Sequence, residues 1–309
     1  ERLEDMTPCI ACLQGCVANM YAGNPICCLT NPFLGHEAEP IAKTENPKKV
    51  MVIGGGVAGL CAAFIAKEKG HEVTLYEAGD VLGGNMRLAA YPPGKGDITN
   101  MIRSYIHRCQ KDGVKIVMNC EVTPELIKEE KPDSVIIATG SKTLILPIEG
   151  IDNPAIIHGS DLLDGKRPAG KKVLVVGGGM VGCETAAFLG EQEHDVTVIE
   201  FRDTVGADVI HEHRVYLMKD FEDYGIKEIT GAKVCKFYED GVEYETADGV
   251  RHETRGYDSV ILSMGFRNYN PLEEKIKDLV PETHVIGDAI RARRALDATK
   301  EAYEVASRL

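Results

Sequence analysis

Two stretches of the chain repeat one order of apolar and polar positions. In the first, an apolar run at 50–53 ends in glycines, a segment of helical composition follows at 57–70, and a second apolar run ends at Glu77. The same order recurs from Lys171 to Glu200. A short buried strand, a helix and a second strand form a βαβ unit, so the pattern predicts two such units.

Further periodic segments lie between and after the two units. The pattern predicts a helix at 98–111 and strands at 114–118 and 134–140. After the second unit it predicts strands joined by turns at Asp240-Gly241 and Asp248-Gly249, and then a closing strand and helix. These elements give each unit enough strands for a parallel sheet.

The glycines after the first strand have the spacing of a dinucleotide-binding turn. They are Gly54, Gly56 and Gly59, with Glu77 closing the second strand 18 residues later. Glycine permits the tight turn, lets the backbone approach a pyrophosphate and allows close helix packing, while the acid accepts hydrogen bonds from ribose hydroxyls. The alternative is a glycine-rich turn without a ligand, which the strand-helix-strand context disfavours.

The second unit carries a matching set of glycines: Gly177, Gly179 and Gly182. Glu200 follows at the same distance, and an acid there repels a 2′-phosphate, which favours NADH over NADPH. Arg202 lies close enough in sequence to leave this choice open. Glu184 is a candidate to line the nicotinamide pocket, and a solvated helix position is its alternative.

Five of the ten cysteines lie within the first 28 residues, in a segment without a sustained helical or strand period. Four of them have a spacing that suits a four-iron cluster: Cys9, Cys12, Cys16 and Cys28. Structural zinc more often uses two separated CxxC pairs, so we favour the cluster over zinc, and over disulfides. Adjacent Cys27 competes for the fourth place, and spacing alone does not exclude it.

The later cysteines do not form a redox pair. Disulfide reductases that use pyridine nucleotides place paired cysteines near one of the two units, whereas the first helix here has only Cys61 and the second only Cys183. Electrons that reach a flavin therefore need another acceptor. The cysteine-rich segment is the candidate.

Charge and hydropathy argue against two classes of partner, nucleic acids and membranes. A formal net charge of -13 repels phosphate backbones, so we expect no nucleic-acid partner. No apolar run approaches the roughly 20 residues of a membrane span. Residues 1–5 lack the basic and apolar regions of a secretory signal. We therefore expect a cytoplasmic protein without membrane association.

The motifs taken together resemble a known family. They are CIACLQGC at 9–16, CLTNP at 28–32, LGGN at 82–85, PPGKGD at 92–97, ATG at 138–140 and the two glycine sets. They resemble the C-terminal half of the iron-sulfur flavoenzymes related to old yellow enzyme. That group includes 2,4-dienoyl-CoA reductase, 2-enoate reductase and trimethylamine dehydrogenase. The similarity spans almost the whole chain.

The resemblance implies a fold and a division into domains. It implies an α/β chain with two Rossmann-like dinucleotide-binding domains of glutathione-reductase type, one inserted in the other. A small iron-sulfur segment at 1–46 precedes them. The FAD-binding domain is then expected at 47–155 and 256–309, and the inserted NAD(P)H-binding domain at 156–255.

The resemblance also implies roles for individual residues. The first glycine set and Glu77 hold the ADP half of FAD, and the ligand directly before the LxNP stretch is Cys28 rather than Cys27. Further FAD contacts are implied at six positions: Gly84, Asn85, Thr139, Gly140, Gly287 and Asp288. Asn85 stands where the family has glutamine and is shorter by one methylene. No catalytic side chain is assigned.

The implied function is that of an NAD(P)H-dependent oxidoreductase similar to 2-enoate and 2,4-dienoyl-CoA reductases. The chain would be an electron-input module, passing hydride from NADH to FAD and single electrons through a [4Fe-4S] cluster to FMN in an N-terminal or separate (β/α)8 barrel. The barrel would reduce an enoate or enoyl C=C bond. Because the chain begins where that barrel would end, we expect a fragment or a separately encoded half without the substrate site.

Two alternatives stay open at this point. One is an amine-dehydrogenase-like module that holds ADP as a structural ligand in the first site. The other is a non-catalytic nucleotide-binding module with structural zinc. The sequence also leaves the oligomeric state open, a homo-oligomer included.

Overall fold

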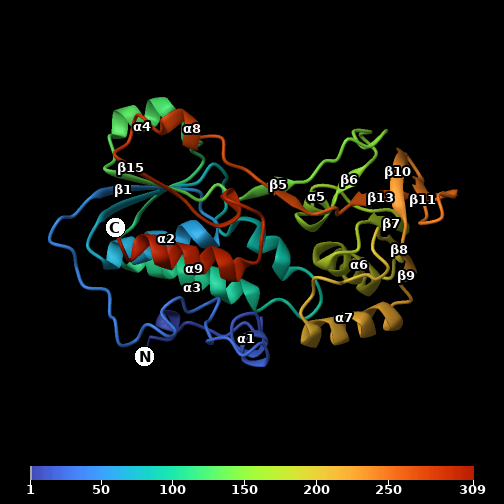
Figure 1. The fold of residues 1–309 in the computed structure, drawn as a ribbon, viewed down its shortest axis with the longest axis horizontal. Helices are drawn as coiled ribbons and strands as arrows, with labels where there is room; N and C mark the ends of the chain where they lie inside the picture. The colour runs from blue at the N-terminus through green and yellow to red at the C-terminus, as the bar shows by residue number, and fades with distance from the viewer. Residues whose placement is uncertain (1) are drawn as a thin grey trace. The chain divides into compact units, whose positions relative to one another are not determined.

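The chain, described from residue 2 to residue 309 in a computed structural model, folds as two units that each contain a parallel sheet (Figure 1). The first unit comprises the residues up to Ala90, Gly96–Lys142 and Arg267–Leu309, and the second comprises Tyr91–Lys95 and Thr143–Phe266. The second unit therefore extends on both sides beyond the 156–255 range expected from the sequence.

The sheet of the first unit has the strand order β15-β4-β1-β2-β3, and every pair is parallel. Its strands are β1 (Lys49–Ile53), β2 (Glu72–Tyr76), β3 (Lys115–Val117), β4 (Ser134–Ile137) and β15 (Glu282–Val285). Parallel pairing requires crossover connections, and helices supply them. The last strand in sequence pairs with β4, so the sheet is completed by the C-terminal part of the chain.

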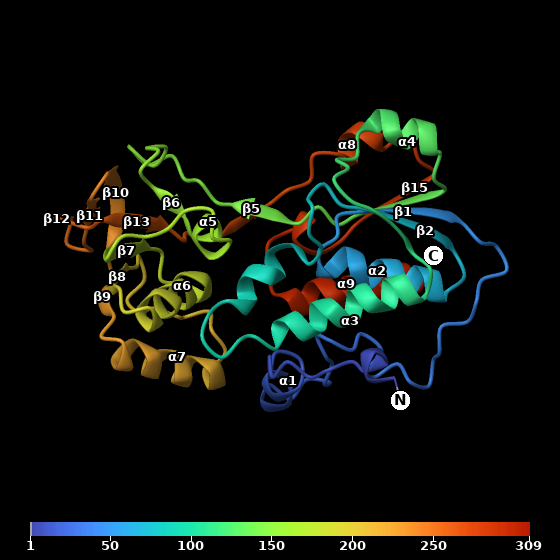
Figure 2. The same ribbon diagram turned by 180° about the vertical axis from the view of Figure 1, so that it is seen from behind.

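Alternate residues of β1 face two separate apolar cores. Val50 and Val52 pack on one face against three helices, and Met51 and Ile53 pack on the other against two short ones. The helices are α2 (Val57–Glu68), α3 (Ile98–Lys111) and α9 (Ala295–Ala306) on the first face, and α4 (Pro124–Glu130) and α8 (Glu273–Ile276) on the second. Figures 1 and 2 show both layers. Burial on both faces explains why these strands are continuously apolar.

The second unit repeats this arrangement with one difference. Its parallel sheet has the order β6-β13-β7-β8-β9, from β6 (Ile157–His158), β7 (Lys172–Val176), β8 (Asp195–Ile199), β9 (Lys227–Ile229) and β13 (Ser259–Leu262). Helices α5 (Gly159–Leu163), α6 (Met180–Glu191) and α7 (His211–Asp223) belong to the same unit. Val173 and Val175 face α6 and α7, whereas Leu174 and Val176 face an antiparallel sheet instead of helices.

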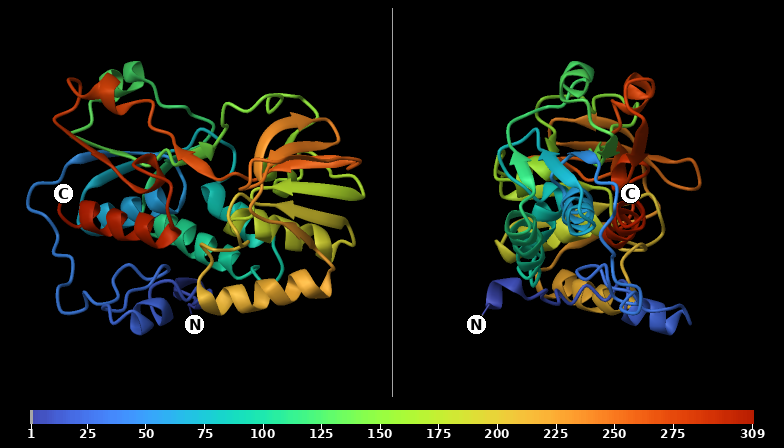
Figure 3. Two further views of the ribbon diagram at one scale, coloured as in Figure 1. Left: turned by 45° about the vertical axis from the view of Figure 1, so that its right-hand side comes forward. Right: turned by 90° about the vertical axis from the view of Figure 1, so that its left-hand side faces the viewer.

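That antiparallel sheet consists of β10 (Lys233–Tyr238), β11 (Gly241–Glu245) and β12 (Arg251–Thr254). Its side chains Val234, Phe237 and Val242 pack on the parallel sheet. Figure 3 shows these strands in orange on the opposite face from α6 and α7. The predicted Asp-Gly turns join the strands, while β12 is a strand that the sequence pattern did not predict.

The remaining elements are short. They are η1 (Leu3–Asp5), α1 (Val17–Tyr21), η2 (Gly84–Ala90), η3 (Gly287–Ala289) and the two-stranded pair β5 (Ser141–Thr143) and β14 (Phe266–Asn268). Within residues 2–309, no helix combines the length and the apolar character that a bilayer crossing requires.

The cysteine-rich segment is attached to the first unit by polar and aromatic contacts. The Tyr105 hydroxyl donates to the carbonyl oxygen of Leu29 at 3.0 Å, inside the core. The Arg108 guanidinium lies over two neighbouring rings, 4.6 Å from the centroid of Phe33 and 4.4 Å from that of Phe64. A cation over an aromatic face is attracted to it, so Arg108, which is on α3, links Phe33 of the segment to Phe64 of α2.

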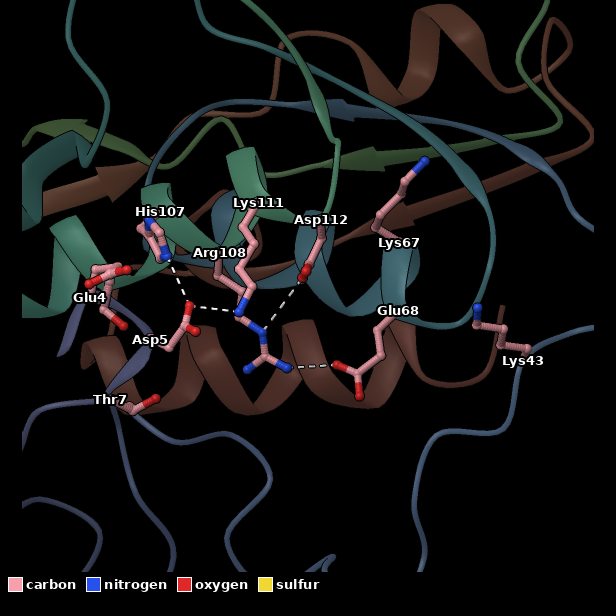
Figure 4. Close-up of a pocket in the computed structure, with 11 residues that line it drawn as sticks. Glu4, Asp5, Thr7, Lys43, Lys67, Glu68, His107, Arg108, Lys111 and Asp112 are labelled. Atoms are coloured by element: carbon pink, nitrogen blue, oxygen red, sulfur yellow. Dashed lines mark hydrogen bonds and ion pairs between the residues drawn. The ribbon is translucent and has the colours of Figure 1, made fainter. Parts of the chain in front are cut away.

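A cavity of about 570 Å³ lies where the N-terminal segment meets helices α2 and α3 (Figure 4). Its lining is charged, and most of the charges pair within it. Lys111 and His107 bond the Asp5 carboxylate, and Arg108 bonds Glu68. None of the residues predicted to bind a cofactor lines this cavity. It belongs to the attachment of the N-terminal segment rather than to a nucleotide site.

Candidate functional site

The first glycine turn joins β1 to α2, and its three glycines have three different environments. A Cβ added at Gly54 would lie 2.3 Å from the carbonyl oxygen of Ala138, and one at Gly59 would lie 1.9 Å from that of Gly54. Gly54 also has a φ of +108°. Gly56 has open space around its Cβ position. The outer glycines therefore close the turn, while the middle one leaves room for a phosphate to approach the backbone.

The second turn, between β7 and α6, has the same geometry. A Cβ at Gly177 would lie 2.4 Å from the carbonyl oxygen of Ser263, and one at Gly182 would lie 1.8 Å from that of Gly177. The nearest atom to a Cβ at Gly179 belongs to Asp208, at 3.5 Å. The repeated glycine spacing in the sequence thus corresponds to repeated close contacts of the outer glycines in the structure.

Each unit fixes an acidic side chain at the end of its second strand. Glu77 accepts hydrogen bonds from the amides of Gly55 and Gly79, both at 2.7 Å. These bonds use one lone pair on each oxygen and leave the carboxylate able to accept from ribose hydroxyls. They also fix its orientation, so the group is ordered before a ligand arrives.

Glu200 is held in the same way in the second unit. It accepts from the amide of Gly178 at 2.6 Å and from that of Arg202 at 2.9 Å. Arg202 therefore contributes its backbone to the orientation of Glu200, whichever way its exposed side chain turns.

The amino end of α6 differs from that of α2. Asp208 accepts a hydrogen bond from the amide of Met180 at the first residue of α6. Among residues 2–309, no side chain makes such a bond to the first residue of α2, Val57. Free amides at a helix amino end are what bind a pyrophosphate. The amino end of α6 is therefore partly occupied by the chain's own carboxylate.

Two of the predicted flavin contacts converge on the first glycine turn. A Cβ at Gly84 would lie 3.1 Å from the Cα of Gly56, and one at Gly287 would lie 3.1 Å from the Cβ of Ala58. Both glycines have positive φ, 55° and 63°. Close approach and backbone conformation together account for glycine at these positions.

A chain of hydrogen bonds connects the other predicted flavin contacts. The Asn85 amide donates to the Ser141 hydroxyl at 3.4 Å, and that hydroxyl donates to Asp288 at 2.8 Å. Thr139 donates to the carbonyl oxygen of Tyr269 from the same strand end. Gly140, between Thr139 and Ser141, has a φ of +72°. Sequence reasoning missed Ser141, although it directly follows the ATG motif.

Glu184 lies on the first turns of α6 and is only 8% exposed. It forms an ion pair with Lys95, which belongs to the same unit. The position is therefore not a solvated helix surface. Lys95 is part of the PPGKGD motif, but its partner, 89 residues away, could not be read from the sequence.

The four predicted cluster ligands act on one another electrostatically. Burial raises the pKa of the Cys12 thiol, an amide hydrogen bond from Gln14 lowers it, and Cys28, Cys16 and Cys9 raise it further. The four sulfurs therefore share one neighbourhood. Among residues 2–309, no three His, Cys, Asp or Glu side chains are placed to hold a single metal ion.

The backbone around these cysteines is arranged to bring its amides to the sulfurs. Ala11 donates to the Cys9 sulfur at 3.4 Å, and Ala11 itself has a φ of +51°. The amide of Cys27 donates to the carbonyl oxygen of Gly15 at 2.9 Å, which joins the stretch that carries Cys28 to the stretch that carries Cys16. Hydrogen bonds to sulfur are a known feature of iron-sulfur sites, so the residues fit a cluster.

Three of the five later cysteines are buried, Cys61, Cys109 and Cys183, whereas Cys120 and Cys235 are partly exposed. Cys61 and Cys183 are both 0% exposed, and burial raises the pKa of Cys183 to about 12. A thiol with so high a pKa is not a nucleophile near neutral pH. All ten cysteines are free.

Comparison with known proteins assigns the family. The family model for pyridine nucleotide-disulphide oxidoreductases matches residues 48–286, which include both glycine turns. The chain belongs to this family. As a pyridine nucleotide-disulphide oxidoreductase it is an oxidoreductase of the flavin- and NAD(P)-using class, and the predicted α/β fold is confirmed.

Individual members of the family match nearly the whole chain. It is 32% identical to a metal reductase of Desulforamulus reducens, over 98% of this chain and 50% of that protein. It is 32% identical to a cinnamate reductase of Clostridium sporogenes, over 100% of this chain and 46% of that protein. The chain thus spans about half the length of the curated relatives that it matches.

A solved structure also matches nearly the whole chain. The chain superposes on 2-naphthoyl-CoA reductase in complex with 2-naphthoyl-CoA with a TM-score of 0.94 and 32% identity, covering 99% of this chain and 47% of that one. The resemblance to the C-terminal half of the flavoenzymes related to old yellow enzyme is thereby confirmed.

Proposed function

We propose that the chain is the electron-input module of an NAD(P)H-dependent flavin and iron-sulfur oxidoreductase. The bound groups would supply hydride transfer from NADH to FAD and one-electron transfer through a [4Fe-4S] cluster to FMN in a (β/α)8 barrel, joined or separate, that reduces an enoate or enoyl C=C bond. Among the relatives, a cinnamate reductase and 2-naphthoyl-CoA reductase support this substrate class. The protein's own part is to bind, orient and separate these groups.

The repeated geometry of the two glycine turns carries the proposal. Each unit presents a middle glycine without a contact closer than 3.5 Å and a carboxylate held by two amides, Glu77 in one and Glu200 in the other. One dinucleotide site would suit many classes of enzyme. Two such sites in one chain suit a donor nucleotide and a flavin.

The residues of the first unit fit FAD. The turn at Gly54, Gly56 and Gly59 would take the pyrophosphate, and Glu77 would accept from the adenosine ribose. The Asn85-Ser141-Asp288 chain of hydrogen bonds would face the ribityl and pyrophosphate region. Gly84 and Gly287 would let the backbone approach the cofactor closely.

The residues of the second unit fit a nicotinamide dinucleotide, with NADH favoured by Glu200. Gly177, Gly179 and Gly182 would take its pyrophosphate. This requires the Asp208 carboxylate to leave the amide of Met180, because two anions cannot share that donor. Glu184 would lie toward the nicotinamide end.

The thiols Cys9, Cys12, Cys16 and Cys28 would hold the cluster. Cys28 is favoured over Cys27 as the fourth ligand, because Cys28 is the one of the two that acts electrostatically on the partly buried Cys12.

Activity of the isolated chain tests the proposal. After anaerobic reconstitution with iron, sulfide and FAD, we expect NADH-dependent reduction of ferricyanide or a viologen dye and no reduction of cinnamate. The substrate site would lie in the barrel, so the dye is the only acceptor present. Cinnamate turnover by this chain alone would contradict the modular assignment.

Variants of two neighbouring cysteines provide a test and its control for the cluster ligands. The Cys28→Ala variant should lose bound iron and the visible absorption of the cluster, whereas Cys27→Ala should keep both. Equal iron in the two variants would remove Cys28 from the ligand set.

The same preparation separates the alternatives. Heat releases the bound nucleotide, and FAD supports the proposal whereas ADP supports the amine-dehydrogenase-like module. A colourless protein with one equivalent of zinc would instead support a non-catalytic nucleotide-binding module.

A further inference from the structure

Glu301, in α9, reaches back to the turn that follows the last strand of the first sheet. Its Oε2 accepts a hydrogen bond from the backbone amide of Gly287 at 2.7 Å. The Glu301 side chain is 23% exposed, so this bond is partly shielded from water. A hydrogen bond to an ionised acceptor is stronger than one between neutral groups. The carboxylate therefore fixes the start of the Gly287–Asp288 turn.

Arg293 connects Glu301 with the second residue of that turn, Asp288. The Arg293 guanidinium bonds Oε1 of Glu301. The backbone amide of Arg293 donates to Oδ1 of Asp288 at 3.1 Å, and the Ser141 hydroxyl donates to Oδ2. Each carboxylate oxygen of Glu301 and Asp288 therefore has a partner, which determines how both groups are oriented.

The Gly287–Asp288 turn lies against the first glycine turn. A Cβ at Gly287 would lie 3.1 Å from the Cβ of Ala58, in the first turn of α2, and 3.3 Å from that of Ala298, in α9. Figures 1 and 2 show α9 beside α2. The amino end of α2 is the proposed pyrophosphate site, so a displacement of the Gly287–Asp288 turn would change its distance from the FAD.

Stability alone does not account for these bonds. Ion pairs between partly exposed side chains contribute little to stability. The Lys49–Glu130 pair of the same unit is similarly exposed, at 37% and 31% against 31% and 23% for Arg293–Glu301. It lies at the start of β1, whereas Glu301 bonds the backbone just after the end of β15. The carboxyl ends of parallel strands are where open α/β sheets bind their ligands.

We propose that Glu301 and Arg293 are positioning residues of the FAD site, which hold the Gly287–Asp288 turn so that Asp288 faces the ribityl chain of the cofactor. This rests on the proposed function, in which the first unit binds FAD. In this role neither residue touches the FAD. Glu301 acts through the amide of Gly287, and Arg293 acts through Glu301 and Asp288. The turn is thereby ordered before the cofactor binds, by a helix that follows it in the sequence.

Two ligands that share the adenosine diphosphate half test the inference. We would measure dissociation constants of FAD and of ADP, which lacks the ribityl chain and the flavin ring, on the full chain prepared without flavin. Glu301→Ala should weaken FAD about tenfold and leave ADP unchanged, because the loss of a hydrogen bond to a charged group has this size and affects only the ribityl side. Arg293→Met should weaken FAD less, since the bond from Gly287 to Glu301 remains. Arg293→Lys should retain most of the affinity.

A double-variant cycle separates one connected group of bonds from two independent contacts. The Arg293 side chain acts through Glu301, so the double variant Glu301→Ala/Arg293→Met should bind FAD no more weakly than Glu301→Ala alone. Additive losses would overturn the inference, and so would equal losses for FAD and ADP. The control Lys49→Met removes a comparably exposed ion pair of the same unit and should change neither constant.

Hydrogen exchange of the flavin-free chain gives a readout that does not depend on the cofactor. In Glu301→Ala the amide of Gly287 should exchange about tenfold faster than in the unmodified chain, while the amides of β1 should keep their rates. Unchanged exchange at Gly287 would contradict the inference. Faster exchange in β1 as well would indicate a folding defect, and the comparison of Arg293→Met with Arg293→Lys then decides.

The unmodified chain separates this inference from the proposed function. Failure of the unmodified chain to bind FAD, whether or not it binds ADP, would refute FAD in the first unit. Binding of both ligands, with FAD unaffected by Glu301→Ala and Arg293→Met, would leave the proposed function standing and refute the role of both residues.

Discussion

Asp208 accepts a hydrogen bond from the backbone amide of Met180 at 2.8 Å. This amide begins α6, in the place where the second glycine turn would bind a pyrophosphate. The equivalent amide of α2 has no side-chain partner among residues 2–309. Two turns with the same glycine spacing therefore differ in whether a ligand must displace part of the protein.

We expect the Asp208→Ala variant to bind NADH more tightly than the unmodified chain. Its carboxylate and the pyrophosphate compete for one amide, and a charge at a helix amino end is worth about 0.3–1 kcal/mol, which corresponds to about a two- to fivefold lower dissociation constant. Titration with 1,4,5,6-tetrahydro-NAD, which cannot give a hydride, measures this dissociation constant by fluorescence or calorimetry. Asp223→Ala, on the surface of α7, is the control and should leave the constant unchanged. Weaker binding by Asp208→Ala would mean that the carboxylate assists the ligand.

The two acidic strand ends should affect two different cofactors. Glu77→Gln should lower the content of bound FAD and leave tetrahydro-NAD binding intact, while Glu200→Gln should weaken tetrahydro-NAD about tenfold and leave the FAD content intact. A glutamine can accept only one of the two amide bonds, and the loss of a bond to a charged group has this size. Flavin absorbance and nucleotide titration on each variant give both readouts. A loss of both cofactors in either variant would point to a folding defect.

Arg108 should determine how firmly the cysteine-rich segment is attached. Arg108→Ala removes the contact with Phe33 and Phe64 and leaves Glu68 without its partner. A loss of about 1.4 kcal/mol in local stability would speed proteolytic cleavage within residues 2–46 about tenfold. Mass spectrometry of the fragments measures this. Arg255→Ala, which removes a comparable contact with Tyr238, should not change it.

Lowering the pH should weaken the attachment of the same segment, because Asp5 becomes protonated. Hydrogen bonds from Lys111 and then His107 hold the pKa of Asp5 below its ordinary value of 3.8. The folded chain keeps this carboxylate ionised at lower pH than the unfolded chain does. Its contribution to stability is therefore complete above about pH 4 and is lost as the pH falls through the lowered pKa.

Hydrogen exchange of residues 2–7 at pH 6 and pH 3 checks this. We expect protection to fall at pH 3 in the unmodified chain, and Asp5→Asn to show the lower protection at both pH values. Asp248→Asn changes another carboxyl group with a lowered pKa, in a hairpin of the second unit, and should leave residues 2–7 unaffected. Equal protection at both pH values in the unmodified chain would exclude Asp5 as the titrating group.

The parts of the site that depend on local chain geometry could be predicted from the sequence. Gly54 and Gly177 adopt positive φ within the turn itself, and the glycine spacing records this, whereas the carbonyl oxygens that exclude a Cβ there belong to the distant residues Ala138 and Ser263. The sheets followed from continuously apolar strands, because both faces are buried. Strand β12 was missed because its residues Arg251–Thr254 are polar and none of them is buried, so they carry no apolar pattern.

The parts that depend on distant contacts could not be predicted. Lys95 meets Glu184, and Asp208 meets Met180, because the fold brings loops to the amino end of α6. Neither loop has a periodic pattern that would place it there. Ser141 could have been suspected, since it follows the ATG motif, but its bond to Asp288 spans 147 residues.

The places of the strands in the sequence also determine which unit is complete first during synthesis. The inserted unit is complete once residue 266 has left the ribosome, whereas the first unit still lacks β15, which pairs with β4, and α9, which packs on α2. A nascent chain would therefore hold a finished second unit and an unfinished first unit. Stalled or truncated translation products should expose the apolar surface of α2 and become substrates for chaperones, whichever cofactors are present in the cell.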